Sequence, residues 1–140
     1  MTRQELVLAA LSPAKGELYT PVQVQKLFFL IDENISRTVG GPHFHFEPYH
    51  YGPFDQTVYA ELDRLARMGL VDVTRGRWNT YRLTLAGQAK GEELLNSLDA
   101  PAAAYIRSVS KFVRDLTFTQ LVAAIYRAYP AMRERSVFQG

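Results

Sequence analysis

The sequence contains no cysteine among its 140 residues. Disulfide bridges and cysteine-ligated zinc are therefore excluded, and the composition fits a reducing compartment. No apolar run approaches the roughly 18 residues that a membrane-spanning helix needs. The amphipathic segment that begins at Met1 lacks the pattern of a signal peptide. We therefore expect a cytoplasmic protein that does not bind membranes.

The sequence also has little net charge, only +2 at pH 7. A weak positive net charge permits nucleic-acid binding but does not demand it. What determines such binding is whether the basic residues cluster on one face. Hydrophobic residues make up 47% of the chain and aromatic residues 12%. This composition is typical of a globular protein, and the length predicts a single domain over residues 1–140.

Motifs of catalysis are absent as well. The sequence has no activated-nucleophile motif, no glycine loop that would cradle a phosphate, and no helical histidine–glutamate zinc motif. We therefore expect a binding protein without a cofactor, and not an enzyme.

The first half of the chain carries the signals of three helices followed by a hairpin. A capping box at Thr2 and Glu5 begins the first helix, and a second helix begins near Pro21. Asp55 is the predicted N-cap of a third helix, which ends at Gly69. Short strands are expected at Leu70–Val73 and Thr80–Leu83, joined by a polar loop over residues 74–79.

This order predicts a mostly α (α+β) fold with a winged helix-turn-helix core over residues 1–84. Residues 36–54 are an insertion between the second and third helices, which a tight turn usually joins. Within it we expect an edge strand or hairpin arm over residues 43–51, interrupted by Pro48, and a turn over residues 51–54.

Residues 85–140 are expected to form a C-terminal helical part. Thr84 caps a helix to about Leu98, and Pro101 starts another. A capping box at Thr117 and Gln120 begins a last helix that stops at Pro130. The predicted apolar stripe of the middle helix consists of Tyr105, Val109, Phe112 and Leu116.

Two short motifs resemble those of the Panacea domain family. The first is Val24-Gln25-Lys26-Leu27-Phe28-Phe29-Leu30, and the second is Pro48-Tyr49-His50-Tyr51-Gly52-Pro53-Phe54. The resemblance spans roughly residues 5–87. It implies a compact, mostly helical domain of phage-related genes and toxin–antitoxin pairs, whose members are antitoxins that neutralise varied toxins or, in one branch, a protease adaptor. A protein partner, such as a toxin, is therefore expected.

The insertion carries two sets of candidate binding residues. Tyr49, Tyr51 and Phe54 could form an exposed aromatic patch for a partner, although packing between helices is the favoured interpretation. We expect a protein-binding surface that combines the insertion with the third helix, and its candidate residues are His45, Tyr49, His50, Tyr51 and Phe54.

A metal site is the alternative interpretation of the histidines. On a strand, His43, His45 and Glu47 would share one face, with His50 as a fourth ligand. The favoured interpretation is that Phe44 and Phe46 enter the core while the histidines face solvent, so no metal is predicted.

DNA binding is the second hypothesis for this chain. The third helix would read bases, and the loop between the strands would contact phosphate. The expected outward residues of that helix are Gln56, Thr57, Ala60, Glu61, Asp63, Arg64 and Arg67. The arginines of the hairpin are Arg75, Arg77 and Arg82, beside Trp78. Glu61 and Asp63 would repel phosphate, and Glu61 with Arg64 is an ordinary helix-surface pair.

Further along the chain, Arg107, Lys111 and Arg114 form a basic stripe, expected to be a solvated face or a dock for an acidic partner. The last two helices either pack on the core or form a homodimer interface. The leading hypothesis is thus a protein-binding module of antitoxin or adaptor type, and the runner-up is a winged-helix regulator that binds DNA. Membership of a larger defence or phage assembly is a third possibility.

Overall fold

The computed structural model describes residues 1–139. In that range the chain is mostly helical with two small antiparallel sheets, which confirms the expected α+β class. The helices are α1 (Arg3–Leu11), α2 (Pro21–Ile35), α3 (Gln56–Arg67), α4 (Leu85–Ser97), α5 (Ala100–Asp115) and α6 (Phe118–Ala128). The strands are β1 (Glu47–Tyr49), β2 (Gly52–Phe54), β3 (Val71–Thr74) and β4 (Thr80–Leu83), and single 3-10 turns lie at Ser12–Ala14 and Pro130–Arg133.

The helices begin where the local sequence directs them. Thr2, Asp55, Thr84 and Thr117 are N-caps, and each side chain accepts a hydrogen bond from a backbone N–H of the first turn. These bonds satisfy donors that a helix leaves free at its start. Gly69 has a φ of 77° and ends α3 in the left-handed conformation, as predicted.

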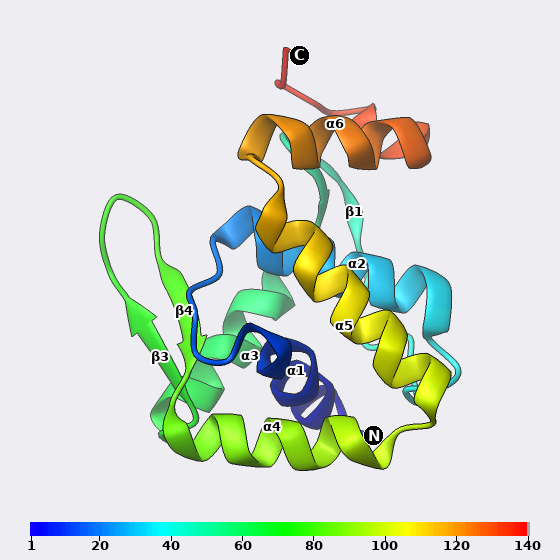
Figure 1. Cartoon of the computed structure of the whole chain (residues 1–140). Coiled ribbons are helices and arrows are strands. Elements are labelled where there is room, and N and C mark those ends of the chain that lie inside the picture. The colour runs from blue at the N-terminus through cyan, green and yellow to red at the C-terminus, as the bar shows by residue number, and fades with distance from the viewer. Residues whose placement is uncertain (140) are drawn as a thin grey trace.

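Helix α1 is the centre of the molecule (Figure 1). Residues 6–11 are all buried, so this helix is apolar on every side. It packs against α2, α3, α4 and α5. Its backbone comes very near α4, where a Cβ added to Gly91 would lie 2.4 Å from the backbone carbonyl oxygen of Leu8. Glycine is therefore required for the two backbones to come this near.

The insertion folds onto α2 as a braced loop followed by a hairpin. The Asp32 carboxylate accepts hydrogen bonds from the backbone N–H groups of His43 and Phe44, at 3.1 and 2.9 Å. Phe44 is buried against Phe28, and Phe46 packs on Phe29. The two phenylalanines thus pack inward, as the favoured interpretation has it, but His43 does not face solvent as expected, because it is half-buried with its ring against the Val39 carbonyl.

Two boundaries predicted for this insertion are wrong. The strand expected over residues 43–51 covers only Glu47–Tyr49, and residues 52–54 form β2 instead of a turn. The register explains the difference, because Pro48 lies opposite Pro53. Proline has no backbone N–H to donate. A pair of opposite prolines therefore fits an antiparallel ladder at a position where neither residue has to donate a hydrogen bond. The turn itself falls at His50 and Tyr51.

The predicted stripe of α5 is also partly wrong. Its buried residues are Ala102, Ala103, Ile106, Val109, Ser110 and Val113. Tyr105 and Leu116 are half-buried, and Phe112 is 41% exposed. Alanine, valine and isoleucine side chains, rather than large rings, face the core, where α5 packs along α2.

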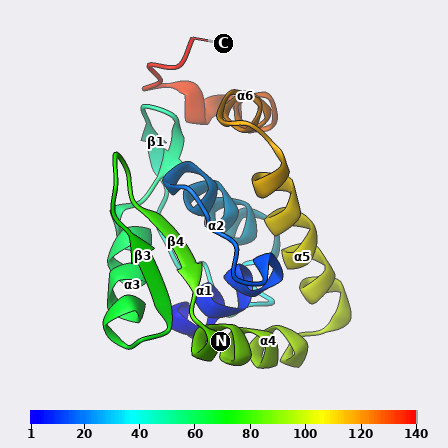
Figure 2. The same cartoon turned by 60° about the vertical axis from the view of Figure 1, so that its left-hand side comes forward.

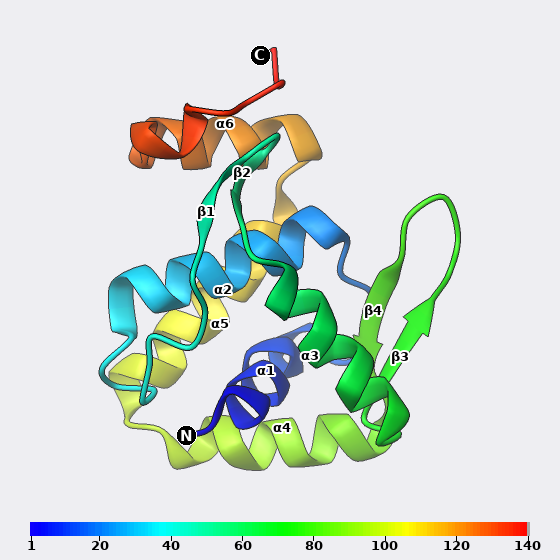
Figure 3. The same cartoon turned by 180° about the vertical axis from the view of Figure 1, so that it is seen from behind.

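The two hairpins project on different sides of α3, as the view from behind shows (Figure 3). The β1–β2 hairpin reaches α6, and the C-terminal segment crosses its tip, where the Val137 N–H donates to the His50 carbonyl at 3.0 Å. The β3–β4 hairpin stands apart from α6 (Figure 2). In the described residues, no helix is both long enough and apolar enough to cross a membrane.

Candidate functional site

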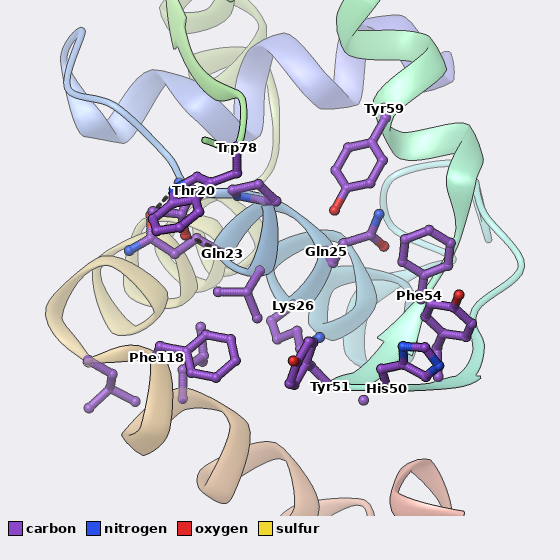
Figure 4. A pocket seen from close by; sticks show the side chains of 16 residues that line it. Thr20, Gln23, Gln25, Lys26, His50, Tyr51, Phe54, Tyr59, Trp78 and Phe118 are labelled. Atoms are coloured by element: carbon purple, nitrogen blue, oxygen red, sulfur yellow. Dashed lines mark hydrogen bonds between the residues drawn. The ribbon is translucent and has the colours of Figure 1, made fainter. Parts of the chain in front are cut away.

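A groove of about 530 Å³ lies between the two hairpins. Its walls come from the start of α2, the β1–β2 hairpin, α3, the loop between β3 and β4, and the start of α6. Six aromatic residues line it, namely Tyr49, Tyr51, Phe54, Tyr59, Trp78 and Phe118 (Figure 4). Residues far apart in the sequence therefore meet at one site.

Four of these rings are large surfaces that remain open to solvent. The exposed fractions are 43% for Tyr49, 45% for Tyr51, 56% for Trp78 and 45% for Phe118. Tyr51 meets Phe118 edge-on with ring centroids 5.1 Å apart, and Tyr49 stacks on His50 at 4.1 Å. Tyr49, Tyr51 and Phe118 each contact a neighbouring ring but stay exposed, so Tyr49 and Tyr51 are not buried between helices as the favoured interpretation has it. A cluster of this kind is typical of an anchor surface for a partner.

Phe54 and Tyr59 form the inner wall of the same groove. Phe54 is half-buried and contacts the rings of Tyr49 and Tyr59. Burial raises the pKa of Tyr59 to about 12, so its hydroxyl stays neutral at any physiological pH. Both rings connect the hairpin to α3.

Lys26 is the charged group of the groove, and it is only 3% exposed. Its Nζ donates to the Pro53 carbonyl at 3.3 Å. Burial lowers the pKa of Lys26 to about 7, since an ammonium group loses hydration when it is enclosed. Among the described residues it has no carboxylate partner. The buried Lys26 amine therefore gives up its proton far more readily than an exposed lysine.

Sequence reasoning did not select Lys26 as a site residue. The available signal was its place within the apolar run Val24–Leu30, where every residue is buried in the structure. A lysine inside such a run is either a snorkelling surface residue or a buried functional one.

The hairpin is held in place by side chains of α2. The Gln25 amide accepts from the Asp55 N–H at 2.9 Å and donates to the Asp55 carbonyl at 3.0 Å. The Asp55 carboxylate accepts from the N–H groups of His45 and Thr57. Partial burial raises the pKa of Asp55, but these hydrogen bonds outweigh it and hold the pKa below its usual value. The start of α3 and the hairpin are thus fixed relative to Lys26.

The residues proposed for DNA contact lie on α3 and the β3–β4 hairpin. Gln56, Arg64 and Arg67 are exposed and Thr57 is half-buried. Arg75 and Arg77 are exposed in the loop beside Trp78. Arg82 lies 3.6 Å from the Asp72 carboxylate, so part of its charge is balanced.

One residue expected on the outer face of α3 is buried. Glu61 is 5% exposed, and it forms no ion pair with Arg64 in the described part of the chain. The cause is its spacing, because Glu61 lies between Val58 and Leu65 at the positions that form the apolar face of a helix. Glu61 therefore does not oppose phosphate from the helix surface in the way expected.

The structure separates the histidines of the metal hypothesis. Nε2 of His43 lies 2.7 Å from the Val39 carbonyl, whereas His45 is exposed and lies 3.7 Å from the Glu47 carboxylate. Within residues 1–139, no three histidine or acidic side chains gather in an arrangement that would hold a metal ion.

The basic stripe of α5 borders a second hollow, between α4 and α5. Arg107 donates to the Asn96 side chain, Lys111 pairs with Asp115, and Arg114 donates to Ser110. Arg107 and Lys111 are exposed and Arg114 is half-buried, and each of the three has a local partner.

No protein-family model, no curated protein and no solved structure matches this chain.

Proposed function

We propose that this chain is a protein-binding module of the antitoxin or adaptor type, and that the groove between its hairpins is the docking site. A winged-helix core formed by residues 1–84 would present the two hairpins that border the groove. The observation that carries the proposal is the convergence of Tyr51, Trp78 and Phe118, from three separate elements, on one apolar groove. Tyrosine and tryptophan are the residues that most often dominate the energy of protein interfaces.

The insertion supports this function better than it supports a catalytic one. Its hairpin is braced by Gln25 and Asp55, so the exposed rings are presented in a fixed arrangement. A preorganised surface loses little entropy when a partner binds. The motifs at residues 24–30 and 48–54, which resemble the Panacea family, supply much of the same groove.

The test is a selection of random linear peptides displayed on phage, with the whole chain as bait. Binders should lose about 30-fold or more in affinity when Tyr51 and Trp78 are both replaced by alanine, equivalent to about 2 kcal/mol. Leu85→Ala is the matched control, because Leu85 is an exposed apolar residue of α4 that does not line the groove. Docking in the groove would be refuted if the selected peptides bound the Tyr51→Ala/Trp78→Ala variant as tightly as the wild type, or if the selection yielded no binding peptide.

The antitoxin role has its own test. The product of a gene adjacent to the one for this chain should arrest growth when expressed alone, and co-expression of this chain should restore growth. The Tyr51→Ala/Trp78→Ala variant should fail to restore it, while Leu85→Ala should succeed. Equal rescue by both variants would exclude the groove from neutralisation.

DNA binding is the second candidate, and the exposed Arg75 and Arg77 at the tip of the β3–β4 hairpin favour it. With α3 in the major groove, these arginines would contact phosphate. The logarithm of the affinity should then fall linearly with the logarithm of salt concentration, and Arg75→Ala should lessen that slope by about one unit. A duplex that fails to bind at low salt would rule out this candidate.

A further inference from the structure

Lys26 gives the groove a chemical preference that its aromatic walls do not explain. The amine has three N–H donors, and the Pro53 carbonyl accepts from one of them. The side chain lines the groove and extends from α2 toward Tyr51 (Figure 4). Lys26 is therefore a buried amine in an apolar groove, with one hydrogen bond and with donors to spare.

None of the other titratable side chains that line the groove or pack beside Lys26 is a carboxylate. His50 and Tyr51 lie on the hairpin, Tyr59 lies on α3, and Tyr126 of α6 lies against Gly52, beside the amine. Among the described residues, Lys26 forms no ion pair, and the carboxylate of Asp55 at the start of α3 accepts from the backbone N–H groups of His45 and Thr57.

A buried ammonium group without a counter-ion is costly, so the amine either gives up its proton, as the lowered pKa of Lys26 indicates, or is stabilised by an anionic partner. We propose that the occupant of the groove is a segment of the partner protein in which an aspartate or glutamate, flanked by apolar side chains, places its carboxylate against Lys26. The aromatic rings would cover the flanking residues. This inference rests on the proposed docking function and specifies the chemistry of the partner.

Charge complementarity also gives the interaction a pH dependence. Because the pKa of Lys26 in the free protein is about 7, the amine is mostly neutral above that pH. A bound carboxylate favours the ammonium form and raises its pKa, so binding above pH 7 takes up a proton. Affinity should fall as the pH rises from 7 to 9, by up to about tenfold per unit.

The experiment uses the peptides selected with the whole chain as bait. Peptides whose binding requires Tyr51 and Trp78 should share an acidic residue next to an aromatic or aliphatic one. Changing that residue to its amide should weaken binding to the wild-type protein by about tenfold or more, the scale of a charged hydrogen bond. The same change should have little effect on binding to Lys26→Met, because the acid then has no partner.

A calorimetric measurement on the wild-type protein makes the test independent of that variant. Titration at pH 8 in two buffers of different ionisation enthalpy should reveal proton uptake on binding of the acidic peptide but not of its amide. Equal affinity for acid and amide, or binding without proton uptake, would overturn the inference while docking in the groove stands. Absence of any groove-dependent peptide would overturn both.

Other occupants are distinguished by the same reagents. If inorganic phosphate or a DNA duplex displaces the acidic peptide from the groove, the site recognises phosphate and the inference is wrong. If the chain alone self-associates in sedimentation, and Tyr51→Ala abolishes that association, a second copy fills the groove and the inference is likewise wrong.

Discussion

Replacing Lys26 with methionine should change how the stability of the protein depends on pH. In the folded state, burial lowers the pKa of Lys26 from 10.5 to about 7. In the unfolded state the amine has its ordinary pKa, so between these values the unfolded chain binds more protons than the folded one. Stability must then rise with pH throughout this window. Below pH 7 both states are protonated, and the contribution of Lys26 to the pH dependence disappears.

The size of the effect follows from the two pKa values. The slope approaches about 1.4 kcal/mol per pH unit once the folded amine is mostly neutral, and it is half as steep at the folded pKa. From pH 7 to pH 9 the free energy of unfolding should therefore increase by about 2 kcal/mol. For a chain of this length, that corresponds to a rise in melting temperature of roughly 5–10 °C.

Urea denaturation at several pH values between 7 and 9 measures this slope directly. The wild-type curve should rise, and the Lys26→Met curve should lack that rise, because methionine has no titrating group. Groups common to both proteins cancel in the comparison. Lys90→Met is the matched control, since Lys90 is an exposed lysine of α4, and it should keep the wild-type slope. Parallel curves for wild type and Lys26→Met would refute the description of Lys26 as a buried, unpaired amine.

Two further predictions concern the packing of the core. Gly91→Ala should destabilise the protein by roughly 2 kcal/mol or more in urea denaturation, because its Cβ would overlap the Leu8 carbonyl. Gly76→Ala, whose Cβ would have no neighbour nearer than 3.7 Å, should change stability by less than about 0.5 kcal/mol. Ser110→Ala should cost about 1–3 kcal/mol, because the buried Tyr19 hydroxyl loses its partner at 2.6 Å. Combining it with Tyr19→Phe should cost less than the sum of the two single changes, and strict additivity would contradict the importance of this hydrogen bond.

The helix boundaries were predictable because their causes are local. A capping box needs only four residues, as at Thr2–Glu5 and Thr117–Gln120, and both predictions are confirmed. The left-handed Gly69 is a similar case. Such local patterns do not predict a feature that depends on contacts between residues distant in the sequence. The α5 stripe failed for this reason, since α1 and α2 determine which side of α5 is buried.

The candidate site was predictable only in part. The motif at residues 48–54 marked Tyr49, Tyr51 and Phe54 as binding candidates, and all three line the groove. Trp78 was placed with the DNA-binding hairpin, and Phe118 received no role. Their convergence depends on how the hairpins and α6 pack together, which no local pattern encodes. Lys26 was missed because its burial results from the hairpin that covers α2.

The placement of Trp78 links the two proposed functions physically. Trp78 lines the groove, while Arg75 and Arg77 belong to the same loop between β3 and β4. A segment seated in the groove therefore lies next to the loop that would contact DNA phosphate. An acidic segment, as inferred from Lys26, would also bring negative charge close to these arginines. Its carboxylate and the phosphates of DNA are both negative, so each disfavours binding of the other at this loop. If the chain performs both functions, partner binding and DNA binding should oppose each other through this loop, with no change of fold required.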